Sequence, residues 1–242
     1  MDYTIILYIF FGILPSLTWL FYYLSKDLHP EPKRMILKIF LWGALITVPV
    51  FFTQIGLAYL LGKINLSPIA TSIIYWFLVI SFTEEIFKYL VVRLKVISSP
   101  HLDEPLDIML YMVVAALGFA ALENILYLFA PVGQMSFDQL MNRTLIIALV
   151  RFIGATFLHT LCSAVIGYSL AISFCEENKK YIIIAVGIIT ATLLHGVYDF
   201  SIMTLDGYVK ILVPVITILT LAFLVFSGFA KLKKMKGICK IK

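Results

Sequence analysis

Three ionisable residues occur close together within an apolar stretch of the sequence. Glu84, Glu85 and Lys88 lie in SFTEEIFKYL, inside a run that is otherwise long and hydrophobic. Residues three or four apart share one face of a helix, so Lys88 can pair with either acid, while the other acid points about 100° around the helix. One glutamate can therefore be structural and the other a general base, and the sequence does not decide between them.

Further polar residues occur in three later apolar runs. They are Glu123 and Asn124, then Arg151 and His159, then His195 and Asp199. Each charged group costs roughly a few kcal/mol when it faces lipid, so we expect these groups to face one another or a water-filled cavity. The four runs are thus predicted to converge on one polar site. Within the last pair the spacing of four lets the carboxylate orient the imidazole.

The composition indicates that these runs lie in a membrane. Of 242 residues, 62% are hydrophobic and only 14% are charged, and the mean hydropathy is +1.00, far from the values of a soluble domain. Seven runs are long enough to cross a ~30 Å hydrocarbon core. They are Ile5–Leu24, Ile36–Leu61, Ile69–Val92, Ile108–Phe129, Val150–Phe174, Tyr181–Met203 and Val209–Ala230. The stretch Phe137–Leu149 either extends the fifth run or forms an eighth helix.

The fold is therefore predicted to be an all-α, polytopic transmembrane bundle. It would be a single domain over residues 1–242, with a basic tail at 231–242. Fourteen of the nineteen Lys and Arg residues fall on one side of the predicted spans and three on the other. The positive-inside rule places the N-terminus outside and the C-terminal tail in the cytoplasm. The net charge of +5 reflects this topology, and we expect no nucleic-acid partner.

Depth along each span indicates where the polar site lies. Glu123, His159 and His195 are predicted at about 21–23 Å from the cytoplasmic boundary, and Glu84 at about 12–20 Å. The site is thus expected in the outer half of the bilayer. Arg151 is expected at the outer boundary as an interfacial anchor, and Asn124 as a hydrogen-bonding group between helices. The simplest role of Phe119, Tyr127 and Tyr198 is packing.

Four motifs, in this order along the chain, resemble those of the PrsW family of intramembrane proteases. They are EExxK (Glu84, Glu85, Lys88), FxxxE within GFAALEN (Phe119, Glu123), an isolated His159, and HxxxD (His195, Asp199). Asp27 with the PEP of Pro30–Pro32, and DEPLD at Asp103–Asp107, support the match. Each motif alone is weak, but their order makes the resemblance specific. The resemblance extends to a wider group that includes CAAX prenyl proteases and bacteriocin-processing enzymes. In that group the second motif typically ends in His, at the position of Glu123 in this chain.

The resemblance implies an intramembrane endopeptidase. Its catalytic residues would be Glu84, Glu85, Glu123, His159 and His195, supported by Lys88, Phe119, Asn124 and Asp199. Glu84 or Glu85 would be the general base that activates water, with both histidines near the scissile carbonyl. We expect a glutamate mechanism without a cofactor, because a base, an oxyanion donor and an acid are all available.

Two alternatives remain open at this point. The first is a zinc-dependent protease with Glu123, His159 and His195 as ligands, although HExxH is absent from the sequence. The second is a non-enzymatic proton- or ion-coupled transporter or membrane sensor that uses the same groups as a relay.

For the protease, the expected substrate is a single-span or other membrane protein cut near its extracytoplasmic side. The resemblance suggests an anti-sigma factor, and a prokaryotic cell membrane as the location.

Overall fold

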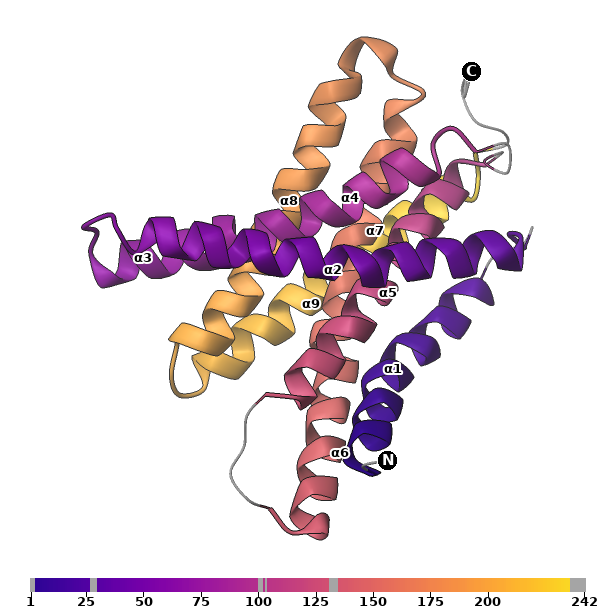
Figure 1. Ribbon diagram of the computed structural model, residues 1–242. Helices are drawn as coiled ribbons and strands as arrows, with labels where there is room; N and C mark the ends of the chain where they lie inside the picture. Colours follow the sequence, from indigo (N-terminus) through magenta and orange to yellow (C-terminus); the bar gives the residue numbers. More distant parts are fainter. Residues whose placement is uncertain (1–2, 27–29, 100–101, 103, 131–134, 236–242) are drawn as a thin grey trace.

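The structure is a computed structural model that describes residues 3–26, 30–99, 102, 104–130 and 135–235 (Figure 1). In these ranges every regular element is helical. Seven segments are long and apolar enough to cross a membrane. The predicted all-α, multi-pass fold is thus confirmed. Of the positions singled out above, Asp27, Asp103 and the last part of the basic tail lie outside the described residues.

The helical segments agree with the predicted runs to within a few residues, except the fifth, which begins at Phe137 rather than at Val150. They are α1 (Tyr3–Leu24), α2 (Lys33–Leu61), α3 (Pro68–Ile74), the π-helix η1 (Tyr75–Phe82), α4 (Thr83–Lys95), α5 (Pro105–Leu128), α6 (Phe137–Ile153), α7 (Ala155–Ser173), the short 3₁₀ helix η2 (Glu177–Lys179), α8 (Lys180–Thr204) and α9 (Val209–Leu232). α3, η1 and α4 together form the third span. The stretch Phe137–Leu149 lies in α6, which joins α7 at Gly154 to form one 37-residue segment, so no eighth span is added.

Local sequence signals explain where several helices begin. Ser67 accepts a hydrogen bond from the backbone N–H of Ala70 and precedes Pro68, so α3 starts with a capped, proline-led turn. At α6, Ser136 and Gln139 bond each other's backbone N–H groups as a capping box. α5 begins with Pro105 and a corresponding exchange between Glu104 and Asp107.

The third span changes its helical geometry just before the acidic pair. η1 ends at Phe82, and Glu84 and Glu85 follow in the first turn of α4. The hydroxyl of Ser81 donates to the carbonyl of Trp76, five residues earlier, as suits this wider helix. π-helical turns are rare and often occur at functional sites.

α5 is the central helix of the bundle. In its most apolar window 94% of residues are buried, whereas the windows of α1, α2 and α9 are 22–33% buried. Glycine allows α2 to cross α5 at very short range: a Cβ on Gly43 would meet the backbone carbonyl of Ala115, and one on Gly118 that of Phe40. Small residues commonly permit such close helix crossings in membranes.

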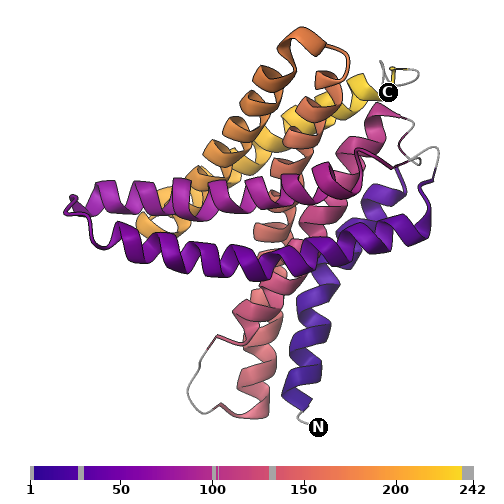
Figure 2. The same cartoon turned by 45° about the horizontal axis from the view of Figure 1, so that its top comes forward.

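The helices cross near the middle of the molecule, and their connections lie on different sides of it (Figures 1 and 2). The turn between α7 and α8 lies at the top of both views and the turn between α2 and α3 at the left. The start of α1 and the start of α6 lie at the bottom.

Candidate active site

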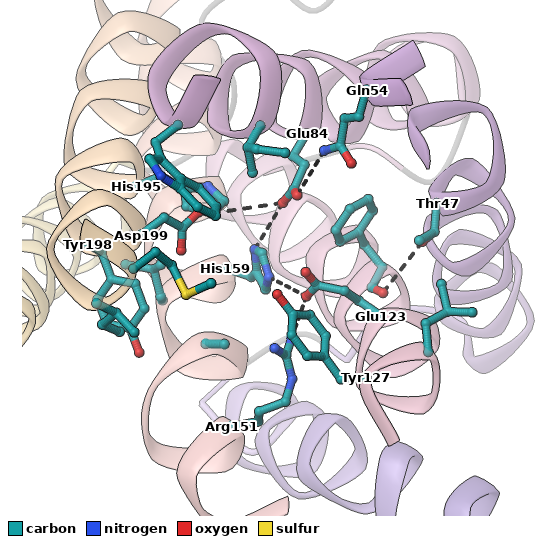
Figure 3. A pocket seen from close by; sticks show the side chains of 18 of the residues that line it. Thr47, Gln54, Glu84, Glu123, Tyr127, Arg151, His159, His195, Tyr198 and Asp199 are labelled. Atoms are coloured by element: carbon teal, nitrogen blue, oxygen red, sulfur yellow. Dashed lines mark hydrogen bonds and ion pairs between the residues drawn. The ribbon is translucent and has the colours of Figure 1, made fainter. Parts of the chain in front are cut away.

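A cavity of about 740 Å³ lies among α2, η1, α4, α5, α6, α7 and α8 (Figure 3). Its wall includes the predicted site residues Glu84, Phe119, Glu123, His159, His195 and Asp199, and also Thr47, Gln54, Tyr127, Arg151 and Tyr198. The four apolar runs that carry charged residues do converge here. Glu85, Lys88 and Asn124 lie behind this wall, buried in the protein.

Glu84 lines the cavity, and its two carboxylate oxygens have different surroundings. Its Oε1 accepts a hydrogen bond from Nε2 of Gln54 at 3.2 Å. Its Oε2 lies 3.8 Å from both Nδ1 of His159 and Nε2 of His195. Among the described residues this oxygen has no hydrogen-bond partner, although it is buried. Glu84 therefore places an uncommitted oxygen between two imidazole rings.

Both carboxylate oxygens of Glu85 contact protein side chains. Nζ of Lys88 donates to Glu85 Oε1 at 2.6 Å, and Nδ1 of His195 lies 2.9 Å from the same oxygen. Ser163 donates to Oε2 at 3.4 Å. Both Glu85 and Lys88 are fully buried. Lys88 thus pairs most closely with Glu85, three positions away, and lies 3.9 Å from Oε2 of Glu84, which lines the cavity.

His159 bridges two charged groups through its two ring nitrogens. Nε2 lies 2.9 Å from Oε2 of Glu123, and Nδ1 lies 3.1 Å from Nζ of Lys88. An ionised carboxylate only accepts and an ammonium only donates, so Nε2 carries the hydrogen and Nδ1 is the acceptor. Phe119 contacts both His159 and Lys88. The Phe119 and His159 rings meet edge-on with centroids 5.5 Å apart, and Nζ of Lys88 lies 4.9 Å from the centroid of the Phe119 ring.

His195 lies between two carboxylates. Its Nδ1 faces Glu85 at 2.9 Å and its Nε2 faces Oδ2 of Asp199 at 3.2 Å. The imidazole can donate to both only when both nitrogens carry hydrogen. The HxxxD spacing on α8 therefore brings the acid onto the ring, as predicted. Gly196 lets η1 approach α8 closely, because a Cβ there would meet the ring of Phe77.

Arg151 was predicted to be an interfacial anchor, and this was wrong. Its guanidinium bonds Glu123 and Asn124 in the cavity wall. The prediction started the fifth span at Val150, which put Arg151 at the membrane boundary. Because α6 and α7 form one segment, Arg151 instead lies near its middle.

Sequence reasoning also missed residues that carry no charge. Gln54 bonds Glu84, and Thr47 lies within 3.5 Å of the carbonyl of Phe119. Single uncharged polar residues in an apolar run give a weak signal, and nothing in their spacing marks them. Tyr127 and Tyr198, expected only to pack, line the cavity.

Two sets of described residues have ligand atoms close enough together for a metal site. One is the buried set Glu85, Cys162 and His195, and the other lies in the cavity wall. Glu84, His159 and His195 each offer a ligand atom, and these atoms lie within 4.8 Å of one another. The set differs from the predicted one by Glu84 in place of Glu123, because Glu123 is held by Arg151 and His159. The far nitrogen of each histidine contacts a carboxylate, an arrangement usual around protein-bound zinc. The donor set therefore fits zinc, which would take the place of the Lys88 and Asp199 contacts.

Comparison with known proteins identifies the family. Residues 31–227 match the model of the PrsW family, described as intramembrane metalloproteases. The Protease PrsW of Clostridioides difficile (strain 630) is 33% identical over 198 residues, 79% of this chain and 77% of that protein. That of Bacillus subtilis (strain 168) is 29% identical over 229 residues, 94% of both chains. No solved structure shows a significant match. Given the full-length relatives and the motif residues gathered around one cavity, this chain belongs to the PrsW family of intramembrane proteases.

Proposed function

We propose that this protein is an endopeptidase that cuts another membrane protein within the bilayer, with Glu84 as the general base that activates water. The observation that carries the proposal is the position of Glu84 in the cavity wall: its Oε2 has no hydrogen-bond partner among the described residues and lies 3.8 Å from a ring nitrogen of both His159 and His195. A general base must reach the proton it removes. Glu85 has no such access, since Lys88, His195 and Ser163 surround it.

The neighbouring residues supply the other steps of amide hydrolysis. His195, held by Glu85 and Asp199, is placed to donate a proton to the leaving amine. Gln54, whose amide nitrogen lies beside Glu84 in the cavity wall, is placed to stabilise the developing oxyanion. Glu123 supports His159 rather than acting on the substrate. The catalytic role of Glu123 inferred from the motif thus becomes a positioning role.

The cavity suits an apolar stretch of polypeptide. Away from the acidic and histidine cluster its wall is largely hydrophobic, for example at Val50, Phe51, Ile146, Ile202 and Met203. A peptide bond in an intact membrane helix is shielded by its own turn, so the substrate segment must unwind locally before attack. A single-span protein presents one such segment. The family resemblance makes an anti-sigma factor the first substrate to test.

The cut is expected near the extracytoplasmic end of the substrate. The cavity residues lie in the later parts of α2, α5 and α8 and in the first turns of α7. The predicted topology places these parts in the outer half of the bilayer. Membership of a protease family also disfavours the transporter and sensor alternatives.

A zinc enzyme is the second candidate, and two observations favour it. Glu84, His159 and His195 can act as ligands, and carboxylates hold the far nitrogens of both histidines. Four carboxylates of the cluster (Glu84, Glu85, Glu123, Asp199) also outnumber its two permanent cations, Lys88 and Arg151, and a divalent cation would offset this excess. Bound zinc would polarise the scissile carbonyl and make water more acidic.

The test is cleavage of a fluorogenic single-span substrate by the purified protein in liposomes. We expect cleavage that a zinc chelator does not change, and loss of cleavage by about 10²–10⁴-fold in His195→Ala, as for removal of an acid–base group. Loss of activity with the chelator, restored by added zinc, would select the second candidate. If the folded protein cleaves no single-span substrate, both the glutamate and the zinc mechanism are contradicted.

A further inference from the structure

We propose that Arg151 is a positioning residue of this site, which fixes Glu123 and through it the orientation and tautomer of His159. The proposal builds on the proposed function, because His159 matters for catalysis only if it borders the scissile bond. Its structural part, the control of the His159 tautomer, can be tested without any substrate.

Arg151 on α6 is held by three neighbouring side chains of α5. One terminal nitrogen donates to Oε2 of Glu123 at 2.5 Å, and Nε donates to Oδ1 of Asn124. The guanidinium carbon lies 4.0 Å from the centroid of the Tyr127 ring, on which the cation stacks. Figure 3 shows Arg151, Tyr127, Glu123 and His159 following one another along the cavity. The planar, multiply donating guanidinium suits this combination in a way that lysine does not.

Asn124 anchors the far side of the guanidinium. It is buried, and its amide nitrogen donates to the carbonyl of Gly12 at 3.2 Å and to Oγ1 of Thr156 at 3.1 Å. With both donors used, its oxygen must face Arg151. α1, α5, α6 and α7 thus meet around one amide, which limits the positions that the guanidinium can adopt.

The same oxygen of Glu123 receives both Arg151 and His159. Nε2 of His159 lies 2.9 Å from it. Because the guanidinium of Arg151 stays charged, it favours the ionised form of the Glu123 carboxylate. An ionised carboxylate only accepts, so Nε2 of His159 must be the donor. Nδ1 is then left without hydrogen, facing Lys88 at 3.1 Å and Glu84 at 3.8 Å. Arg151, acting through Glu123, and Lys88 on the opposite side of the ring therefore favour the same tautomer, with the unprotonated Nδ1 toward the proposed base.

Loss of Arg151 would affect the ring through Glu123. The arginine and glutamate side chains are only 11% and 19% exposed, so the carboxylate would lose its charge partner in a mostly apolar wall. Among the described hydrogen bonds of Glu123, no other donor would then hold its carboxylate against Nε2 of His159. His159 would lose its fixed hydrogen-bond acceptor. The neighbouring Glu84–Gln54 bond does not involve these groups and should persist.

The experiment compares Arg151→Gln, Glu123→Gln and the double variant with the wild type in lipid. Arg143→Gln is the matched control, because Arg143 lies on the same helix but donates to the carbonyl of Leu128 and is not among the residues that line the cavity. Two readouts are needed. Nitrogen NMR of ¹⁵N-histidine-labelled protein reports the tautomer of His159, assigned with a His159→Gln sample among the four histidines of the chain, and cleavage kinetics report kcat and KM separately.

We expect Arg151→Gln to change the His159 tautomer signal and to lower kcat by about 10–100-fold with little change in KM. Adding Arg151→Gln to Glu123→Gln should cause no further loss, and Arg151→Lys should recover part of the activity. If Arg151→Gln does not fold, the Glu123→Gln and Arg151→Lys spectra provide the same test. An unchanged tautomer signal, multiplicative losses in the double variant, or an effect on KM alone would overturn the proposal. Absence of cleavage in all samples, with the tautomer shift present, would count against the proposed function only.

Discussion

At the scale of single residues, two adjacent glutamates have different surroundings. Glu85 shares a fully buried ion pair with Lys88, which His195 and Ser163 complete. Glu84 lines the cavity, and among the described side chains Gln54 is the one that donates a hydrogen bond to it. The same residue type is therefore structural at one position and available for chemistry at the next.

Glu85→Gln is expected to destabilise the fold, because it leaves Lys88 buried without its main charge partner. Removing one member of a buried pair costs about 3–5 kcal/mol, whereas replacing both by apolar groups is often neutral. Thermal unfolding in detergent should thus show a lower midpoint for Glu85→Gln and a largely restored one for Glu85→Gln with Lys88→Met. A single variant as stable as the wild type would contradict the structural role.

Sequence reasoning found the charged members of the site but not their division of labour. EExxK allows Lys88 to pair with either acid, and the choice depends on His195 and Ser163, which come from other helices. Contacts of this kind depend on how the helices rotate against one another, and a single sequence does not encode that rotation in any local pattern.

At the scale of helices, the crossing of α2 and α5 positions the site. Gly43 and Gly118 bring the two backbones together, and this holds Gln54 on α2 near Glu84 and Glu123 on α5 near His159. The spans themselves were predictable, because length and hydropathy decide them. The joined α6–α7 segment was one of two alternatives that the sequence left open. The π-helix η1 was not predictable, since it has no distinct composition.

Gly118→Ala is expected to lower stability by about 1–3 kcal/mol, the usual cost of overpacking, because its methyl group would collide with the Phe40 carbonyl. Gly56→Ala is the matched control on α2. No atom lies within 4 Å of its added Cβ, and alanine favours helix by up to about 1 kcal/mol. The thermal midpoints of the two variants check this. Equal midpoints would show that the crossing is not tight.

At the scale of the whole molecule, the cavity and a group of basic residues lie at different ends of the helices. Cavity residues lie in the later parts of α2, α5 and α8. The start of α2, the end of α4 and the start of α8 carry the basic residues Lys33, Arg93, Lys95, Lys179 and Lys180. The charge pattern and the position of the cavity together predict a catalytic site in the outer half of the bilayer.

Cysteine labelling in intact cells tests this orientation. In a background with Cys175→Ser and Cys239→Ser, Lys63→Cys and Lys210→Cys should react with a membrane-impermeant maleimide. Lys95→Cys should react only after permeabilisation. The buried Cys162 provides the unlabelled baseline. The reverse pattern would refute the orientation and move the expected cut to the cytoplasmic side.

The most direct test of the account is the cleavage of one single-span substrate by wild-type and Glu84→Gln protein in the same lipid, with products identified by mass spectrometry. The account predicts a cut near the extracytoplasmic end by the wild type and by Gly56→Ala. It predicts a loss of at least about 10²-fold in Glu84→Gln, without change in the thermal midpoint. Comparable cleavage by folded Glu84→Gln would contradict the assignment of Glu84 as the general base.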